Sequence, residues 1–236
     1  MNHSSEPSRG RFFHLEMSEF WSGDLGLTLI TISLIVIIFV ITPLREAGVP
    51  GRIFFDLLTV ALMIFGALTI NQSRIASVFV IITLATSAAV LGAARVHPTP
   101  FLQQFGSLLV TIALLVYVRI VLLVMFRAGP VTWSRMQGGV CAYLLVGMAW
   151  ASAYEFIEQV FPGSFHFTDL PRDIDQLTSK LTYYSFTTLT TLGSEISPVT
   201  PLARSLTVGE AIVGQLFPAI LIGALVAMAM QSRSKS

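Results

Sequence analysis

A threonine-rich segment between two apolar stretches carries the residue types best suited to chemistry in this chain. Lys180 to Leu192 reads KLTYYSFTTLTTL, which is too short to cross a bilayer but long enough for a re-entrant helix. Gly193 then interrupts the helical pattern, and Pro198 and Pro201 follow it. Irregular backbone at membrane depth is tolerated only where it is buried in protein or lines water. Carbonyl and hydroxyl oxygens in such a place can replace the water shell of a cation.

The rest of the chain is apolar enough to hold this segment in a membrane. Of its 236 residues, 54% are hydrophobic and 11% are charged, whereas about 25% are charged in an average soluble domain. A helix needs about 20 residues to cross the hydrocarbon layer, and six stretches reach that length. They lie between Asp24 and Arg45, from Ile53 to Ile70, between Arg74 and Arg95, from Phe101 to Phe126, between Arg135 and Glu155, and after Glu210.

The segment that begins at Tyr183 resembles a known family. YYSFTTLTTLGSEISPVTPLARSLTVGEAIVGQL is similar to the pore segment of bacterial two- and six-transmembrane potassium channels, in which the pore helix and filter read TLTTLGYGDITP. The resemblance covers residues 135–230, and residues 1–130 match by helix count alone. It implies that four identical chains meet at one axis and surround a dehydrated cation with rings of backbone oxygens.

The resemblance also implies which residues form the ion path. Thr191 is expected at the inner end of the filter, where it offers both its hydroxyl and its carbonyl. Leu192 and Gly193 continue the row of carbonyls, so a monovalent cation, K⁺ or Na⁺, is expected at these three residues. Ser194 and Glu195 complete the filter. Support is expected from three threonines of the pore helix, Thr187, Thr188 and Thr190.

The filter departs from the family pattern after its first glycine. The chain reads GSE where the family has GYGD, so the aromatic residue and the second glycine are missing. Because glycine reaches backbone angles that Ser194 disfavours, we expect a shortened ladder with a wider mouth. Four copies of Glu195 around this mouth would repel one another and bind divalent cations and protons. Weak potassium selectivity is then expected. In the alternative arrangement Glu195 pairs with Arg204 or the pore helix, behind the filter.

The expected fold is an all-α integral membrane protein with six transmembrane helices, tetrameric around a central pore. The predicted parts are a cytoplasmic N-terminal segment 1–24, with or without an interfacial helix, a peripheral four-helix bundle 25–127 that resembles a voltage sensor, and a pore domain 128–236. Within the pore domain we expect an outer helix 132–160, an outer loop 161–179, a pore helix 180–191, a filter 191–195 and an inner helix 202–230.

The inner helix contains candidate gating residues. Pro218 removes one backbone hydrogen bond and is the best candidate for a kink, and Gly214 and Gly223 are further candidates for a kink or gate. Close helix packing is an equal interpretation of each glycine. Glu210 is expected to hydrogen-bond the pore helix, with a position in the vestibule as the alternative.

Voltage sensing is not expected of this chain. A voltage sensor needs several arginines at every third position of the fourth span, and this span offers Arg119 followed by Arg127 alone. We therefore predict a conductance that depends little on voltage. Arg119 is expected to lie near the cytoplasmic interface and Asp56 of the earlier span near the outer face, each as an interfacial anchor.

Charge in the loops gives a weak indication of orientation. With both termini inside, the lysine and arginine count is seven inside against six outside, which decides little. The acidic residues of the long connection favour an outer vestibule that attracts cations, and hence cytoplasmic termini in the cell membrane. These residues are Glu155, Glu158, Asp169, Asp173 and Asp175.

Other classes of protein fit the sequence less well. An enzyme is not expected, because the histidines fall outside the predicted spans, at His3, His14, His97 and His166. A secondary transporter would show an internal repeat, which we do not find. A non-conducting or regulatory channel-like subunit remains an alternative. The expected partners are three further copies of the chain, lipid and monovalent cations, with no nucleic acid and no organic cofactor.

Overall fold

The computed structural model describes residues 28–47, 82, 85–86, 89–90, 92–93, 99–126 and 133–233. Four helices in these ranges are long and apolar enough to cross a membrane, namely Thr28–Glu46, Pro100–Leu123, Met136–Val160 and Pro201–Ala227. Each falls on a predicted span, which confirms an all-α membrane protein. The predicted segment 1–24, the span 53–70 and most of the span 74–95 lie outside the described residues, so the total of six helices stays a prediction.

The first described span changes its helical geometry in the middle. It is α-helical from Thr28, passes through the π-helix η1 (Ile37–Ile41), and continues as α2 (Thr42–Glu46). Pro43 explains the change, because proline has no N–H for the carbonyl one turn earlier and its ring crowds that carbonyl. The Thr42 hydroxyl donates to the Ile37 carbonyl at 2.8 Å and so satisfies a backbone group within the widened turn.

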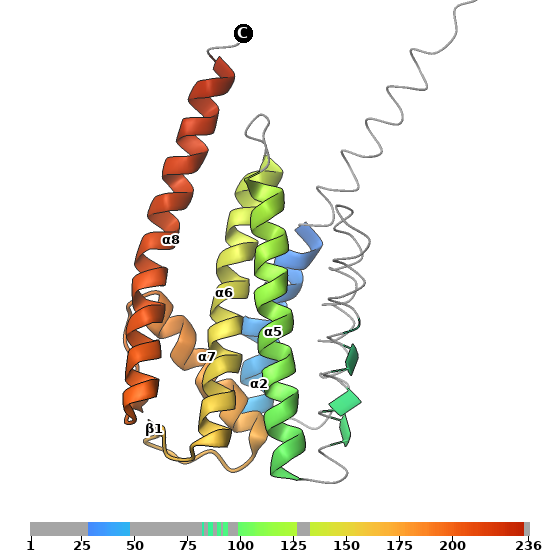
Figure 1. Ribbon diagram of the computed structural model, residues 1–236, viewed down its shortest axis with the longest axis vertical. Coiled ribbons are helices and arrows are strands. Elements are labelled where there is room, and N and C mark those ends of the chain that lie inside the picture. Colours follow the sequence, from blue (N-terminus) through green and yellow to red (C-terminus); the bar gives the residue numbers. More distant parts are fainter. Residues whose placement is uncertain are drawn as a thin grey trace, which may run out of the picture.

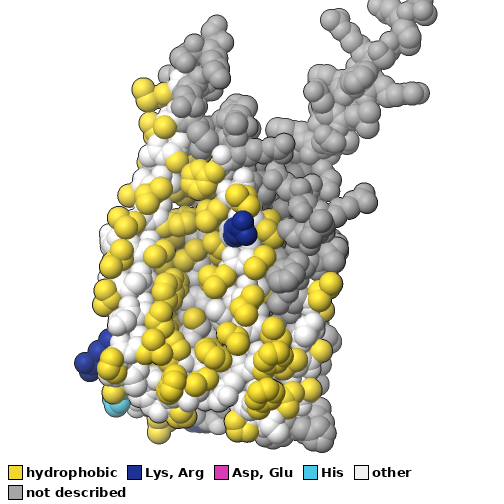
Figure 2. Space-filling model, viewed as in Figure 1, with side chains coloured by type: hydrophobic (Ala, Val, Ile, Leu, Met, Phe, Trp, Pro, Cys, Tyr) yellow, Lys and Arg dark blue, Asp and Glu magenta, His cyan; other side chains and the backbone are white. Residues whose placement is uncertain are grey.

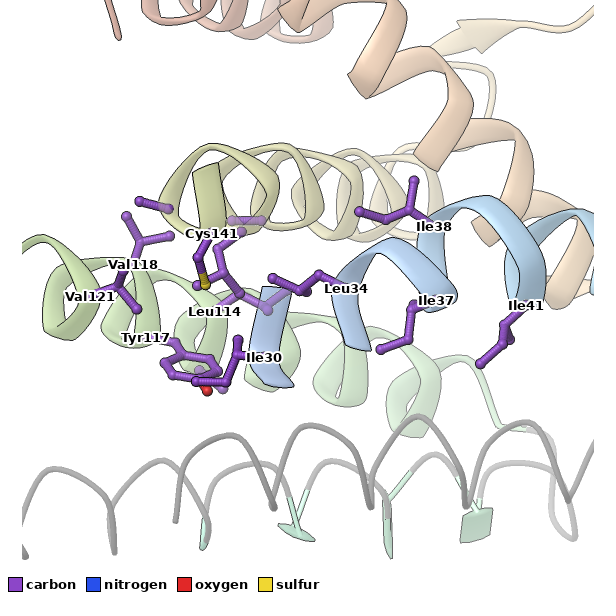
Figure 3. Close-up of a cluster of buried hydrophobic side chains, with 14 residues drawn as sticks. Ile30, Leu34, Ile37, Ile38, Ile41, Leu114, Tyr117, Val118, Val121 and Cys141 are labelled. Atoms are coloured by element: carbon purple, nitrogen blue, oxygen red, sulfur yellow. The ribbon is translucent and has the colours of Figure 1, made fainter. Parts of the chain in front are cut away.

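Two long helices pack beside this span. Helices α5 (Pro100–Met125) and α6 (Trp133–Val160) run antiparallel to each other (Figure 1). A cluster of buried side chains fills the space between the three elements (Figure 3). Its labelled members are Ile30, Leu34, Ile37, Ile38, Ile41, Leu114, Tyr117, Val118, Val121 and Cys141. This packed bundle forms the support for the segment that follows α6.

The connection after α6 contains the short helix α7 (Ile174–Leu189) between two short strands. Strands β1 (Phe165–His166) and β2 (Ser197–Pro198) pair antiparallel, and the N–H of Val199 donates to the carbonyl of Ser164 at 2.8 Å. The pairing ties the start of the connection to its end. Helix α7 and the turn after it therefore lie within a loop whose two ends are joined by the paired strands.

Helix α7 is longer at its start than the sequence predicted. It begins six residues before the predicted range 180–191 and ends two residues before the end of that range. The carboxylate of Asp173 accepts the N–H of Gln176 at 3.0 Å and caps the helix, which stabilises a helix start. The outer loop predicted at 161–179 is correspondingly shorter. An Asp followed three residues later by Gln is a capping signal that would have given this boundary.

Helix α8 (Pro201–Arg233) stands at the edge of the described chain (Figure 1). It covers the predicted inner helix 202–230. Only 11% of its most apolar stretch is buried within the chain. Hydrophobic side chains cover much of the face of the molecule that Figure 2 shows. The exposed large apolar residues of α8 are Leu202, Val208, Ile212, Val213, Leu216, Ile220, Ile222, Val226 and Met230. A helix of this kind needs lipid or further protein around it.

Candidate ion-conduction site

Helix α7 ends in a left-handed turn. The N–H of Leu192 donates to the carbonyl of Thr187 at 2.8 Å, and the N–H of Thr191 donates to that of Thr188 at 3.0 Å. This pair of bonds is the Schellman arrangement, in which the residue just past the helix takes a positive φ. That residue is Thr191, with a φ of 59°. The chain therefore reverses direction where the sequence predicts the filter to begin.

Threonine is a costly residue at this position. Glycine usually occupies it, whereas a residue with a Cβ pays about 1–2 kcal/mol for the left-handed conformation. Among the residues that the structure describes, Thr191 is the only non-glycine with a positive φ. Strain of this kind is characteristic of functional positions. Gly193, with a φ of 88°, takes the second positive angle of the same turn.

The predicted filter residues lie together on the surface of the single chain. Thr191, Leu192 and Gly193 are exposed, and 77% of Leu192 is accessible. Ser194 is half-buried, and its hydroxyl accepts the N–H of Ile196 at 3.1 Å. The structure thus brings three predicted cation-binding residues to one exposed turn, whose N–H groups are bonded to carbonyls of α7.

Glu195 lies exposed beside this turn. In the described part of the chain it makes no ion pair with Arg204, whose guanidinium donates from Nε to the carbonyl of Pro198 at 3.2 Å. The arrangement in which Glu195 is tied behind the filter is therefore not found in the single chain.

Three threonines at the end of α7, predicted as pore-helix support, form hydrogen bonds beside the turn or within it. The Thr187 hydroxyl is buried and lies 3.0 Å from the carbonyl of Tyr183, while its own carbonyl accepts two N–H groups of the turn. The Thr190 hydroxyl donates to the carbonyl of Phe186 at 2.7 Å. Thr188 is half-buried and contributes its carbonyl to the turn.

A buried carboxyl group joins three helices behind the turn. Glu210 of α8 has no accessible surface. It accepts the Tyr154 hydroxyl of α6 at 2.6 Å and the Ser185 hydroxyl of α7 at 2.5 Å. The predicted hydrogen bond between Glu210 and the pore helix is confirmed, and a position in the vestibule is excluded. Sequence reasoning missed the two hydroxyl partners, since nothing in their spacing indicates this meeting.

Gly214 lies against the end of the pore helix. A Cβ built on it would be 2.0 Å from the carbonyl oxygen of Leu189, and the same oxygen accepts the Tyr143 hydroxyl at 3.3 Å. This geometry favours the packing interpretation of Gly214. Pro218 lies inside α8 four residues later and offers no N–H to the Gly214 carbonyl. Gly223 has open space around it, so a role in bending or gating stays a prediction for these two residues.

Two of the five acidic residues of the connection are buried and do not line the predicted outer vestibule. Glu155 is buried and accepts the hydroxyl of Thr178 at 2.9 Å, and Asp175 is buried as well. Glu158 accepts the N–H groups of Gly163 and Phe165 at 2.8 and 3.0 Å, and Asp173 caps α7. The prediction was wrong for Glu155 and Asp175, because both side chains are buried in the fold. Asp169 and Asp173 are exposed and Glu158 is half-buried, so a place in the vestibule stays a prediction for these three residues.

The N-terminal span reaches the pore helix directly. The Ser179 hydroxyl of α7 lies 2.9 Å from Oε2 of Glu46 and 3.2 Å from the carbonyl of Thr42. At the other end of the span, the Thr28 hydroxyl donates to Oε1 of Gln137 on α6 at 2.9 Å. The peripheral bundle is therefore joined to the segment that carries the site.

Comparison with known proteins agrees with this geometry. Residues 142–231 match the family model described as ion channel. No curated protein and no solved structure matches the chain. The matched range includes α7, the exposed turn and nearly all of α8. Residues 142–231 are therefore an ion-channel domain of the superfamily to which the potassium channels belong.

Proposed function

We propose that four copies of this chain form a pore for passive conduction of monovalent cations across the cell membrane, with cytoplasmic termini. The exposed, left-handed turn at Thr191 to Gly193 within the matched domain carries the proposal. One such turn offers too few oxygens to replace the water shell of an ion, whereas four around an axis offer rings of them. K⁺ or Na⁺ would bind at these rings.

The exposure of α8 supports a tetramer. Its apolar side chains face away from the described chain, and the turn lies beside them. If α8 helices of four chains lined one axis, each would gain the packing that a single chain lacks. The carbonyl end of α7 would then point a partial negative charge toward the axis, which favours cations.

The altered filter supports weak selectivity. Without the aromatic residue and second glycine of the family pattern, the turn offers fewer ordered carbonyl rings. We expect purified protein in planar bilayers to pass both K⁺ and Na⁺. External Ca²⁺ should bind at Glu195 and thereby reduce the current. Bi-ionic recordings give the permeability ratio, and potassium selectivity as strong as that of channels with the GYG filter would contradict the proposal.

Two variants serve as controls for this recording. Glu195→Gln removes the proposed ring of carboxylates, so its current should lose most of its sensitivity to Ca²⁺. Gly193→Ala places a Cβ at a φ of 88°, which strains the turn by about 1 kcal/mol or more and should reduce the current. Unchanged Ca²⁺ sensitivity in the first variant would show that Glu195 does not face the ion path.

Gating by voltage is not part of the proposal. Arg119 is exposed on α5, and a single arginine in this span moves too little charge through the membrane field for steep gating. We expect the open probability to change little between about −100 and +100 mV, where one full elementary charge would contribute about 2.3 kcal/mol per 100 mV. A steep rise of current with depolarisation would contradict this expectation.

A non-conducting, regulatory subunit is the second candidate. The missing second glycine favours it, because the shortened ladder can leave too few binding sites for conduction. Oligomeric protein without current in the bilayer recording would support this candidate over the first.

A further inference from the structure

Gln215 of α8 contacts the strained residue of the turn. Its Nε2 donates to the hydroxyl oxygen of Thr191 at 3.0 Å. Both side chains line an open groove whose remaining members are apolar, namely Val208, Ala211, Ile212 and Leu216. A primary amide in apolar surroundings is costly unless it is hydrogen-bonded. The contact therefore satisfies Gln215 and restrains Thr191 together.

The hydroxyl of Thr191 differs from those of three threonines in α7 and at its C-cap. Those of Thr182, Thr187 and Thr190 donate to the carbonyl four residues earlier, which keeps them on the helix. The left-handed turn directs Thr191 away from this pattern and toward α8. A hydroxyl oxygen has two acceptor positions, so the amide occupies one and leaves the other in a fixed direction.

We propose that Gln215 is a positioning residue that sets ion selectivity by fixing the hydroxyl of Thr191, the innermost oxygen of the ion path. The inference rests on the proposed function, because it assigns the contact a part in conduction. Without the amide the hydroxyl rotates between staggered positions, and the innermost ring loses its definite geometry. Discrimination between K⁺ and Na⁺ then falls, since it depends on the arrangement of the coordinating oxygens.

A double-mutant cycle tests this inference. Gln215→Met keeps the size of the side chain and removes the donor, and Thr191→Val keeps the shape and removes the hydroxyl. In reconstituted full-length protein, Gln215→Met should change the K⁺/Na⁺ permeability ratio by about threefold or more, the usual range for one hydrogen bond. In the Thr191→Val background the same substitution should change the ratio no further. Ile222→Met, on an exposed part of α8, is the control and should leave the ratio unchanged.

The outcomes separate the inference from the proposed function. A wild-type ratio in Gln215→Met, or an equal change in both backgrounds, would overturn the inference while leaving the pore intact. If Thr191→Val passes no current, Thr191→Ser replaces it, because the retained hydroxyl should preserve the effect of Gln215→Met. Oligomeric wild-type protein without current would overturn the proposed function and the role in selectivity with it. The hydrogen bond between Gln215 and Thr191 can then be tested by the same double-mutant cycle on thermal unfolding. Additive changes in the unfolding temperature would show that the two side chains do not interact.

Discussion

Gly214→Ala is expected to destabilise the protein and abolish its current. The new Cβ would lie 2.0 Å from the carbonyl oxygen of Leu189 and 2.7 Å from its carbonyl carbon, although Cβ contacts essentially never fall below 3.0 Å. The three nearest atoms all belong to the Leu189 backbone, so no side chain can rotate away. Helix α8 or the end of α7 must shift, at a cost of about 1–3 kcal/mol for overpacking or more. The shift would displace the turn that begins at Thr191, two residues after Leu189.

The sign of the stability change separates the two interpretations of this glycine. If Gly214 were an unobstructed hinge, alanine would stabilise the helix by about 1 kcal/mol through its higher helix propensity. The packing interpretation requires the opposite sign. Thermal unfolding of solubilised protein measures it, and Gly223→Ala is the matched control, because nothing lies within 4 Å of the Cβ that it introduces. An unfolding temperature for Gly214→Ala at or above that of wild type would contradict the packing interpretation.

The sequence was sufficient to predict the four described spans and the turn after α7, because these depend on local signals. Uncharged runs of helical length identify a membrane helix wherever they occur, and the described spans fall on four of them. The threonine run and Gly193 likewise indicate an end of helix followed by a turn. The start of α7 was predicted too late, because the capping signal at Asp173 lies among polar residues that resemble a loop.

The contacts behind the turn could not be predicted, because they depend on how α8 crosses α7. Gly214 and Gln215 are adjacent in sequence, yet one touches the last carbonyl of the pore helix and the other the hydroxyl of the turn. Only the crossing brings both to the same place. Glu155 and Asp175 show the reverse error, since their place in one long connection suggested an exposed, shared surface. Glu155 instead finds partners across the helix interface.

Glu210→Leu is expected to destabilise the packing of α6, α7 and α8 around this buried residue. Leucine fills much of the volume of the glutamate but accepts no hydrogen bond. The Tyr154 hydroxyl, which is fully buried, then loses its acceptor, and an unsatisfied buried group costs about 1–3 kcal/mol. The Ser185 hydroxyl is affected less, because it also lies 2.7 Å from the carbonyl of Gly147 and can donate there. A lower unfolding temperature and a reduced current are the expected measurements.

Glu210→Gln should be much milder for the same geometric reason. The amide oxygen can accept from Tyr154, while its N–H group donates to the Ser185 oxygen, which in turn donates to Gly147. All three polar groups then stay satisfied, so we expect a change of less than about 1 kcal/mol. An equally large loss in Glu210→Gln and Glu210→Leu would indicate that the negative charge, and not the hydrogen-bonding pattern, stabilises this packing.

The double variant Tyr154→Phe with Glu210→Leu removes both partners of the buried hydrogen bond. Removing both partners of a buried hydrogen bond can be nearly neutral, whereas removing one leaves the other unsatisfied. Adding Tyr154→Phe should therefore recover about 1–3 kcal/mol of the stability that Glu210→Leu loses. Because Tyr154 also packs edge-on against Phe165 and Tyr184, phenylalanine keeps the ring contacts and isolates the hydroxyl. If the second substitution lowers the unfolding temperature further, the loss in Glu210→Leu arises from packing and not from the buried hydroxyl.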